Sequence, residues 1–507
     1  MSDSEGGVSA QLRWSVYGIL IALAAGGMAG RLFSVNSVNR ADLEKHLIGK
    51  DLRRAEAKLR QQELSEDELQ EKLAVARERI IQNRQLQRPF LSANDRSRWL
   101  GIRALVELGT YEIDELLDRH NWNTIDMVQH RGRDGELHLY SSKPPLLITL
   151  LAGEYWLIHQ VTGMTLGTHP YVVGRIMLVT INILPMMLMF WLLAKLAERL
   201  GATDWGRIFM VASATLGTLL TTFAVVLNNH IVGAVSATIA LYAFVRIWCD
   251  GENRTRYYVL AGLAGAFTAA NELPALAMLA GLALALWTCD RQAWLRGFLP
   301  AALLVVIAFF ATNYAAHNSL APPYMHKGSD NPEEDWYDYT YTLDGVERES
   351  YWRNRQGIDR GEPSRAAYAL HVLVGHHGIF SLTPIWLLSM AGLFSWCRRG
   401  EPRLRWLALG VIGLTIVCLV FYIVLRPQED RNYGGMCSGF RWMFWFAPLW
   451  LVGLLPAVDS WAHSRAGRGV ALVLLALSVL SVSYPTWNPW TQPWLYLFLE
   501  FCGWQGF

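Results

Sequence analysis

A series of apolar runs constrains the fold of this chain more than any other feature of its sequence. Most of them approach the roughly 20 residues that a helix needs to cross a bilayer. They lie at about 14–28, 172–195, 208–227, 231–247, 257–271, 274–289, 297–315, 378–396, 406–425, 442–457 and 469–484. Only 17% of the 507 residues are charged, against about 25% in soluble domains. The sequence predicts an all-α polytopic membrane protein with about eleven transmembrane helices.

Lys and Arg residues gather in alternate connections between these runs, and such basic connections are typical of the cytoplasmic side. They are Lys195, Arg199 and Arg207; Arg246, Arg254 and Arg256; Arg291 and Arg296; Arg398, Arg399, Arg403 and Arg405; and Arg465 and Arg468. Placing them in the cytoplasm puts the N-terminus inside and the C-terminus outside. The first run fits a cleaved signal peptide or an uncleaved anchor, and we expect the anchor.

Residues 146–161 form a further apolar run that the charge pattern excludes from the spanning set. If this run crossed the bilayer, Arg13 would lie on the opposite side from Lys195 and Arg199. We therefore predict an interfacial helix on the outer surface. The Trp-rich tail at 487–504 is expected on the same face, within an aromatic belt.

Residues 39–87 are strongly charged and helical in composition. Ser65 followed by Glu68 is a capping-box pattern, so we expect helices at about 40–62 and 66–86. An extracytoplasmic hairpin that acts as a spacer or holds a partner protein is favoured over a catalytic role.

These patterns divide the chain into seven parts. They are an N-terminal anchor at 1–35, the hairpin at 36–90, a first external loop at 91–170, a transmembrane core at 171–315, an external loop at 316–375, C-terminal transmembrane helices at 376–484 and an interfacial tail at 485–507. The loop at 316–375 is rich in acidic and aromatic residues, which suit sugar recognition and a solvated loop equally well.

Polar side chains interrupt the apolar sequence mainly at turns predicted to face outward. Each one alone could be a turn residue or an interface anchor. Ionisable groups at membrane depth usually face a cavity or each other, so their convergence on one side favours an outward-facing polar cavity. The residues concerned are Asn229, His230, Glu272, His376, His377, Arg426, Arg431 and Arg441.

Residues 95–155 carry a set of short motifs in the first external loop. They are Asp95, Arg98 and Trp99; Gly109, Thr110 and Tyr111; and Tyr140 followed by Lys143-Pro144-Pro145-Leu146. The stretch resembles the first external loop of polyprenyl-phosphate-sugar-dependent glycosyltransferases of the GT-C fold, such as lipid A aminoarabinose transferases and protein O-mannosyltransferases. Two departures are Arg96, where these families often have a second acidic residue, and Asn271-Glu272, where they have Lys-Gly.

The resemblance implies transfer of a sugar from a polyprenyl-phosphate donor to an unknown acceptor, with inversion, at the outer face of a bacterial cytoplasmic membrane. Asp95 matches the catalytic acidic position and is the expected base, although it could instead cap a helix at 96–108. Lys143, Arg441 and Arg431 are expected to bind phosphate, or, for Lys143 and Arg441, to anchor at the interface. The remaining pocket candidates are Arg98, Asn229, His230, Glu272, His376 and His377.

Other features bear on cofactors, partners and competing functions. The expected partners are the donor, membrane lipid and the acceptor; no cofactor is required, and a divalent metal is possible without being indicated. A net charge of +2 argues against nucleic-acid binding. The alternatives are a transporter or flippase, disfavoured by the lack of a repeat, and a non-catalytic scaffold. Cys437 and Cys502 both lie on the predicted outer side and could pair.

Overall fold

The computed structural model describes residues 9–34, 40–62, 64–83, 90–117, 122–329, 331, 334–343, 345–485 and 488–504. Asp330 and Glu333 of the acidic loop lie outside these ranges, as do the first and last residues of the predicted hairpin region.

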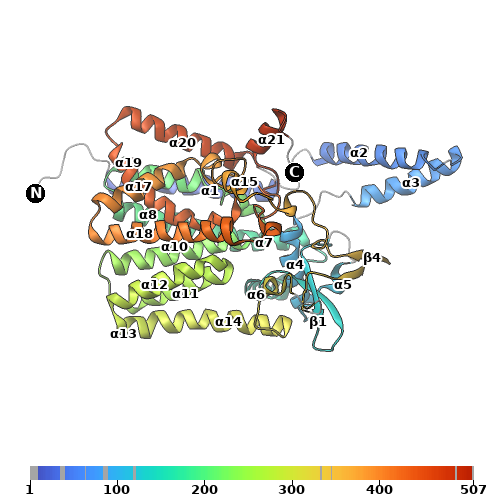
Figure 1. Ribbon diagram of the computed structural model, residues 1–507, viewed down its shortest axis with the longest axis horizontal. Coiled ribbons are helices and arrows are strands. Elements are labelled where there is room, and N and C mark those ends of the chain that lie inside the picture. Colours follow the sequence, from blue (N-terminus) through green and yellow to red (C-terminus); the bar gives the residue numbers. More distant parts are fainter. Residues whose placement is uncertain are drawn as a thin grey trace, which may run out of the picture.

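Apolar helices lie side by side in one elongated bundle (Figure 1). Within the described residues, seven helical segments are long and apolar enough to cross a membrane. They are α1 (Ala10–Ser34); α7, η1 and α8 (Pro170–Leu200); α10 (Asn229–Trp248); α13, η4 and α14 (Arg291–His317); α18 and η7 (Pro402–Leu425); η9 and α19 (Arg441–Ser460); and α20 (Arg465–Ser483). Shorter helices are α9 (Asp204–Leu216), α11 (Thr255–Asn271), α12 (Leu276–Cys289) and α17 (Ile385–Arg399). The prediction of an all-α polytopic membrane protein is confirmed.

The apolar run at 208–227 is not one continuous helix, contrary to the prediction. Helix α9 ends at Leu216, and a short 3-10 turn, η2 (Thr222–Val225), follows a non-helical stretch. Gly217 caps α9, and the hydroxyls of Thr218 and Thr221 bond to backbone carbonyls, which competes with regular helix formation. This irregular segment brings the buried backbone of Leu227 against the start of α4.

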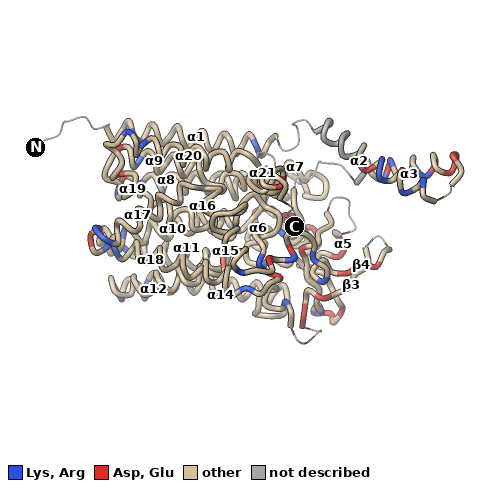
Figure 2. The backbone as a smooth tube through the Cα atoms, turned by 45° about the horizontal axis from the view of Figure 1, so that its top comes forward, with Lys and Arg blue, Asp and Glu red and all other residues tan. Residues whose placement is uncertain are grey.

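The basic connections lie together at one end of the bundle, opposite the long loops (Figure 2). Arg13 of α1 forms ion pairs with Glu198 and Asp204, each 2.8 Å long, so the start of α1 meets the α8–α9 turn. Helix α6 (Pro145–Thr162) lies at the other end, beside α4 (Ala93–Glu107) and α14 (Figure 1). Arg13 and the α8–α9 turn therefore share one end, as the sequence predicts.

The loop end also contains two short β-hairpins that the sequence analysis did not predict. Strands β1 (Met127–Arg131) and β2 (Leu137–Ser141) pair antiparallel, as do β3 (Thr340–Leu343) and β4 (Val346–Glu349). Gly135, with φ of +87°, lies in the turn between β1 and β2, a conformation that glycine adopts without strain. Helix α5 (Asp114–Leu117) precedes the first hairpin.

The charged region forms a helical hairpin, α2 (Arg40–Arg60) and α3 (Glu66–Asn83), which projects beyond the bundle (Figure 1). The capping box is present, because Ser65 N–H donates to the Glu68 carboxylate at 3.1 Å and Glu68 N–H donates to the Ser65 hydroxyl at 3.4 Å. The two predicted helices are confirmed where the structure describes them.

Candidate active site

A cavity of about 770 Å³ opens among the loops at this end of the bundle. Its walls come from the start of α4, the β2–α6 connection, the start of α10, the α11–α12 turn and the segment that precedes α19. Six of the residues predicted for the site line it: Arg98, Lys143, Asn229, His230, Glu272 and Arg441. Of the polar turn residues predicted to converge on one cavity, five line it: Asn229, His230, Glu272, Arg426 and Arg441.

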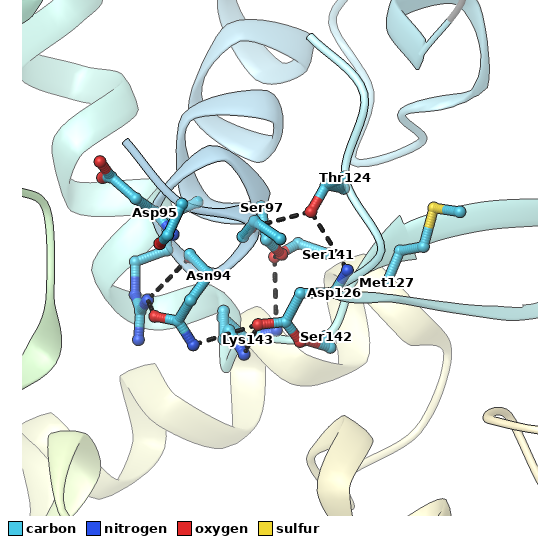
Figure 3. Close-up of polar contacts among 12 residues, drawn as sticks. Asn94, Asp95, Ser97, Thr124, Asp126, Met127, Ser141, Ser142 and Lys143 are labelled. Atoms are coloured by element: carbon cyan, nitrogen blue, oxygen red, sulfur yellow. Dashed lines mark hydrogen bonds and ion pairs between the residues drawn. The ribbon is translucent and has the colours of Figure 1, made fainter. Parts of the chain in front are cut away.

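Lys143 and Asp126 form a buried ion pair in the cavity wall, with Lys143 Nζ 2.5 Å from Asp126 Oδ2. Asp126 also accepts hydrogen bonds from the Ser142 hydroxyl at 2.5 Å and the Asn94 amide at 3.1 Å (Figure 3). Pro145 begins α6 directly after this pair, where its missing N–H is not needed. Lys143 thus lies just before the first turn of α6, and its ion pair with Asp126 joins this connection to the segment before β1.

The pKa of Lys143 is lowered to about 8: burial lowers it most, the charge of Asp126 opposes this, and the charges of Arg98 and Arg441 add to the lowering. Burial would raise the pKa of Asp126, but the charge and hydrogen bond of Lys143 hold it below its usual value. Asp126 is therefore ionised at neutral pH, while Lys143 titrates close to physiological pH.

Arg98 is a buried cation that neutral groups hold in place. It donates to the side chain of Asn94 at 2.7 Å, to the Asn94 carbonyl at 3.1 Å and to the Asn229 amide oxygen at 2.6 Å. Within the described part of the chain it has no carboxylate partner at ion-pair distance. Burial, reinforced by the charge of Arg441, lowers its pKa to about 10.

Arg441 is the second such cation. It donates to the Gly434 carbonyl at 2.6 Å and to His230 Nε2 at 3.0 Å, and it lies over the Trp490 ring. Because Nε2 accepts this bond, the proton of His230 resides on Nδ1, which donates to Glu272 at 2.5 Å. Gly434 has φ of +94°, and a Cβ there would lie 2.4 Å from Arg441 Nε, so only glycine fits beside this guanidinium.

Helix α10 begins at the cavity, and its first turn contributes two polar residues to the cavity wall. Asn228 caps the helix by accepting from Ile231 N–H at 3.1 Å, which places Asn229 and His230 in the first turn. The Asn229 amide donates to Glu272 at 3.0 Å and to the Asn271 carbonyl at 2.8 Å. The α11–α12 turn is thereby tied to α10 and α4 through one side chain.

A second group of charges lies at the same cavity, where Lys327, Arg426 and Asp430 line the wall and Arg355 stands beside them. Of these residues, only Arg426 was expected from the sequence. Asp430 pairs with Lys327, with Arg355 at 3.5 Å and with Arg426 at 3.7 Å. Arg426 lies over the Trp442 ring, with 4.2 Å to its centroid. Three cations around one carboxylate leave an excess of positive charge on this wall.

Asp359 is the cavity carboxylate that stands apart from these pairs. It accepts from the Tyr351 hydroxyl at 2.9 Å and from the Asn432 amide at 3.4 Å, and it has no Lys, Arg or His at ion-pair distance among the described residues. Burial raises its pKa above the usual value. Asp126 and Asp359 were both missed, because each is one of many acidic residues in a long polar stretch without distinctive spacing.

Asp95 lies behind the cavity wall, fully buried. Its carboxylate accepts from the backbone N–H groups of Leu91 and Leu227 at 3.1 and 2.9 Å and from the Trp99 indole at 2.9 Å. In Figure 3 it points away from Lys143 and Asp126. The alternative role of Asp95 as a helix cap is wrong, since α4 begins at Ala93 and Ser92 caps it. These contacts favour a structural role for Asp95.

Arg431, His376 and His377 do not line the cavity. Arg431 donates to the carbonyls of Pro363 and Arg426 at 3.1 and 3.3 Å, which braces two loops. His376 and His377 bond to each other through their Nδ1 atoms at 2.5 Å. Cys437 is buried, Cys502 is exposed, and both are free thiols.

Comparisons with known proteins give matches among solved structures alone. No family model and no curated protein matches the chain. The crystal structure of the Archaeoglobus fulgidus oligosaccharyltransferase in the apo form matches with a TM-score of 0.43 and 10% identity, over 93% of this chain and 55% of that one. The same organism's oligosaccharyltransferase AglB, in complex with an inhibitory peptide and a dolichol-phosphate, matches with a TM-score of 0.38 and 12% identity, over 80% and 53%. This chain thus spans about half the length of those proteins, and the functional argument rests on its own cavity.

Proposed function

We propose that this protein is a membrane glycosyltransferase that moves a sugar from a polyprenyl-phosphate donor to an acceptor at the outer membrane face. One observation carries the proposal: Arg98, Arg441 and Lys143 face one cavity, and neither arginine has a carboxylate partner within the described residues. Buried cations without compensation are destabilising. A phosphate anion would compensate them, and arginine binds it with a matching pair of donors.

Apolar residues on the cavity wall supply a path for a lipid chain. Leu273 and Leu425 line the cavity and are 43% and 68% exposed, and Phe421 lines the same cavity. Leu425 ends a membrane-spanning segment. A polyprenyl chain leaving the phosphate along these residues would pass directly into the bilayer.

The proposed chemistry is a single displacement at the anomeric carbon. The acceptor oxygen or nitrogen forms a bond to that carbon as its bond to the phosphate oxygen breaks, and the electron pair leaves on the phosphate. Arg98, Arg441 and Lys143 stabilise this developing charge. The acceptor proton goes to a carboxylate base, and attack opposite the leaving phosphate inverts the anomeric centre.

Asp359 is the base we propose in place of Asp95. Its carboxylate faces the cavity and is not neutralised by an ion pair, whereas Asp126 and Asp430 are held by lysine. Its raised pKa brings it closer to the range in which general bases work best. Tyr351 and Trp352 line the cavity beside it and offer aromatic faces and a hydroxyl for a sugar or acceptor.

The test has two arms on purified, detergent-solubilised protein. Farnesyl phosphate, a short-chain probe of the donor, should raise the melting temperature, whereas farnesol, which lacks the anion, should not. In membranes supplied with radiolabelled polyprenyl-phosphate sugar, label should move from the lipid to an acceptor.

Asp359→Asn should reduce that transfer about 10²–10⁴-fold while farnesyl phosphate still binds. The matched control is Asp338→Asn, because Asp338 is exposed in the same loop and pairs with Arg353 at the surface. Full sugar transfer by Asp359→Asn would show that Asp359 is not the base. If the label crosses the bilayer while still attached to its lipid, the protein is a flippase and not a transferase.

A further inference from the structure

A compact group of metal-ligating side chains lies outside the cavity. Glu362, His371 and His376 each offer one ligand atom, and these atoms lie within 4.8 Å of one another. A tetrahedral zinc ion with bonds of about 2.1 Å holds its donors about 3.4 Å apart. Side-chain rotations that move the ligand atoms by roughly 1 Å would therefore bring all three within bonding distance of one zinc ion.

The local fold brings these residues together from a short stretch of chain. Ser364 caps α15 (Arg365–Leu373) by accepting from Ala367 N–H, and His371 lies in its last turn. At Gly375 the chain turns so closely that a Cβ would lie 2.6 Å from His371 Nδ1. The turn stacks the His376 ring on His371, with 3.9 Å between centroids.

The surrounding contacts orient the ligands. The Tyr433 hydroxyl donates to Glu362 Oε1 at 2.9 Å, and the Nδ1 atoms of His376 and His377 share one hydrogen bond. Metal-binding histidines and carboxylates usually have such supporting bonds. His371 Nδ1 is a buried nitrogen with no hydrogen-bond partner among the described residues, which is uncommon in a folded protein unless something else occupies the site.

We propose that Glu362, His371 and His376 bind one divalent transition-metal ion, with zinc the best match. Two imidazoles and one carboxylate form a donor set that zinc accepts readily, and cobalt and nickel can take the same ligands. Glu362 and His376 are 8% and 0% exposed, so the ion is held within the fold. The proposal does not depend on the transferase function.

The ion has a structural consequence for the cavity. Tyr433 links Glu362 to the segment that contains Asn432, Gly434 and Gly435, all of which line the cavity. Tyr433 also stacks on His377, with 4.1 Å between centroids. The metal therefore fixes the loop before α15 to the cavity wall that carries the carbonyl partner of Arg441.

The experiment measures metal binding by the full chain in detergent. Protein stripped with EDTA and dialysed is given zinc, and bound metal is counted by mass spectrometry; cobalt substitution adds a visible absorption spectrum. Wild-type protein should bind about one ion per chain and melt at a higher temperature with zinc. His371→Gln and Glu362→Gln should lose the ion and its thermal shift, and Tyr433→Phe should bind it about 10–100-fold more weakly.

The matched control is His463→Gln, which removes an exposed histidine elsewhere in the chain. It should bind zinc as the wild type does. Equal zinc binding by His371→Gln and His463→Gln, or no bound zinc in the wild type, would overturn the proposal. The experiment measures bound metal, so its result is independent of the proposed transferase function. The protein can fail to bind zinc and still bind farnesyl phosphate and transfer sugar, or bind zinc without doing either.

Discussion

Buried arginines at the two ends of the bundle are held in different ways. At the end with the basic connections, Arg13 bonds to two carboxylates, Glu198 and Asp204, both at 2.8 Å. At the cavity end, Arg98 is held by asparagine side chains and a carbonyl, and Arg441 by a carbonyl and a histidine. All three are less than 10% exposed, so burial does not distinguish them.

The difference shows which cations are committed to the fold and which are available to a ligand. Two carboxylates neutralise Arg13 within the protein. Neutral acceptors fix the orientation of Arg98 and Arg441 without removing their charge. The ion pairs of Arg13 therefore stabilise the fold, and the cavity arginines keep their charge for an anion.

Replacing Arg13 gives the largest expected effect on stability. Arg13→Met leaves Glu198 without its cation and Asp204 with Arg207 at 3.4 Å, and removing one partner of a buried pair costs up to about 3–5 kcal/mol. Thermal melts in detergent should show a clear loss, while transfer per folded molecule stays at the wild-type level. An unchanged melting temperature would mean that the ion pairs of Arg13 do not stabilise the fold.

The same substitution at the cavity should act on activity instead. Arg441→Met removes a cation that the fold does not neutralise, so we expect about a 10²–10³-fold loss of sugar transfer with the melting temperature unchanged or raised. Farnesyl phosphate should no longer stabilise this variant. If Arg441→Met mainly lowers stability, the contrast between the two ends fails.

The two ends also differ in what the sequence could predict. The shared end of the basic connections and the helical hairpin follow from composition and charge spacing alone, and the interfacial position of α6 stays a prediction from the same spacing. The expectation that Arg441 lines a cavity followed from its position at a predicted turn, and the same expectation for Arg98 and Lys143 followed from the motif resemblance. Asp126 and Asp359 did not, because their roles depend on which cations reach them across the fold.

Asp95 shows that a sequence motif does not by itself establish the role of a residue. The resemblance assigns it the catalytic position, yet its oxygens accept from Leu91, Leu227 and Trp99. Sequence spacing places a carboxylate on a helix, but whether it faces a cavity depends on the irregular segment after α9. That segment was itself predicted to be helical.

Asp95→Asn tests this structural role. The amide replaces an oxygen that accepts backbone bonds, and leaving such a donor unsatisfied costs about 1–3 kcal/mol. The melting temperature should fall, and transfer per folded molecule should change little. The opposite pattern, lost transfer at an unchanged melting temperature, would restore Asp95 as the base.

The smallest effect that we predict is a dependence of kcat/KM on pH. It distinguishes the charge of Arg13, which the fold neutralises, from the charge of Lys143 at the cavity. Lys143, with a pKa of about 8, loses its proton as pH rises, so kcat/KM should fall above pH 8, by up to about tenfold per pH unit. Asp359 has a raised pKa and must be ionised to act as a base, so the rate should increase with pH on the acid side, above the usual carboxylate range.

Substituting Lys143 tests whether this residue causes the fall in kcat/KM above pH 8. Lys143→Arg replaces the amine with a guanidinium, whose ordinary pKa is well above that of lysine, so the fall above pH 8 should move to higher pH while the acid limb stays in place. Arg13→Met provides the comparison, because its committed charge lies far from the cavity and should leave both limbs unchanged. If Lys143→Arg and the wild type share the same alkaline limb, Lys143 is not the group that holds the phosphate, and the anion site reduces to the two arginines.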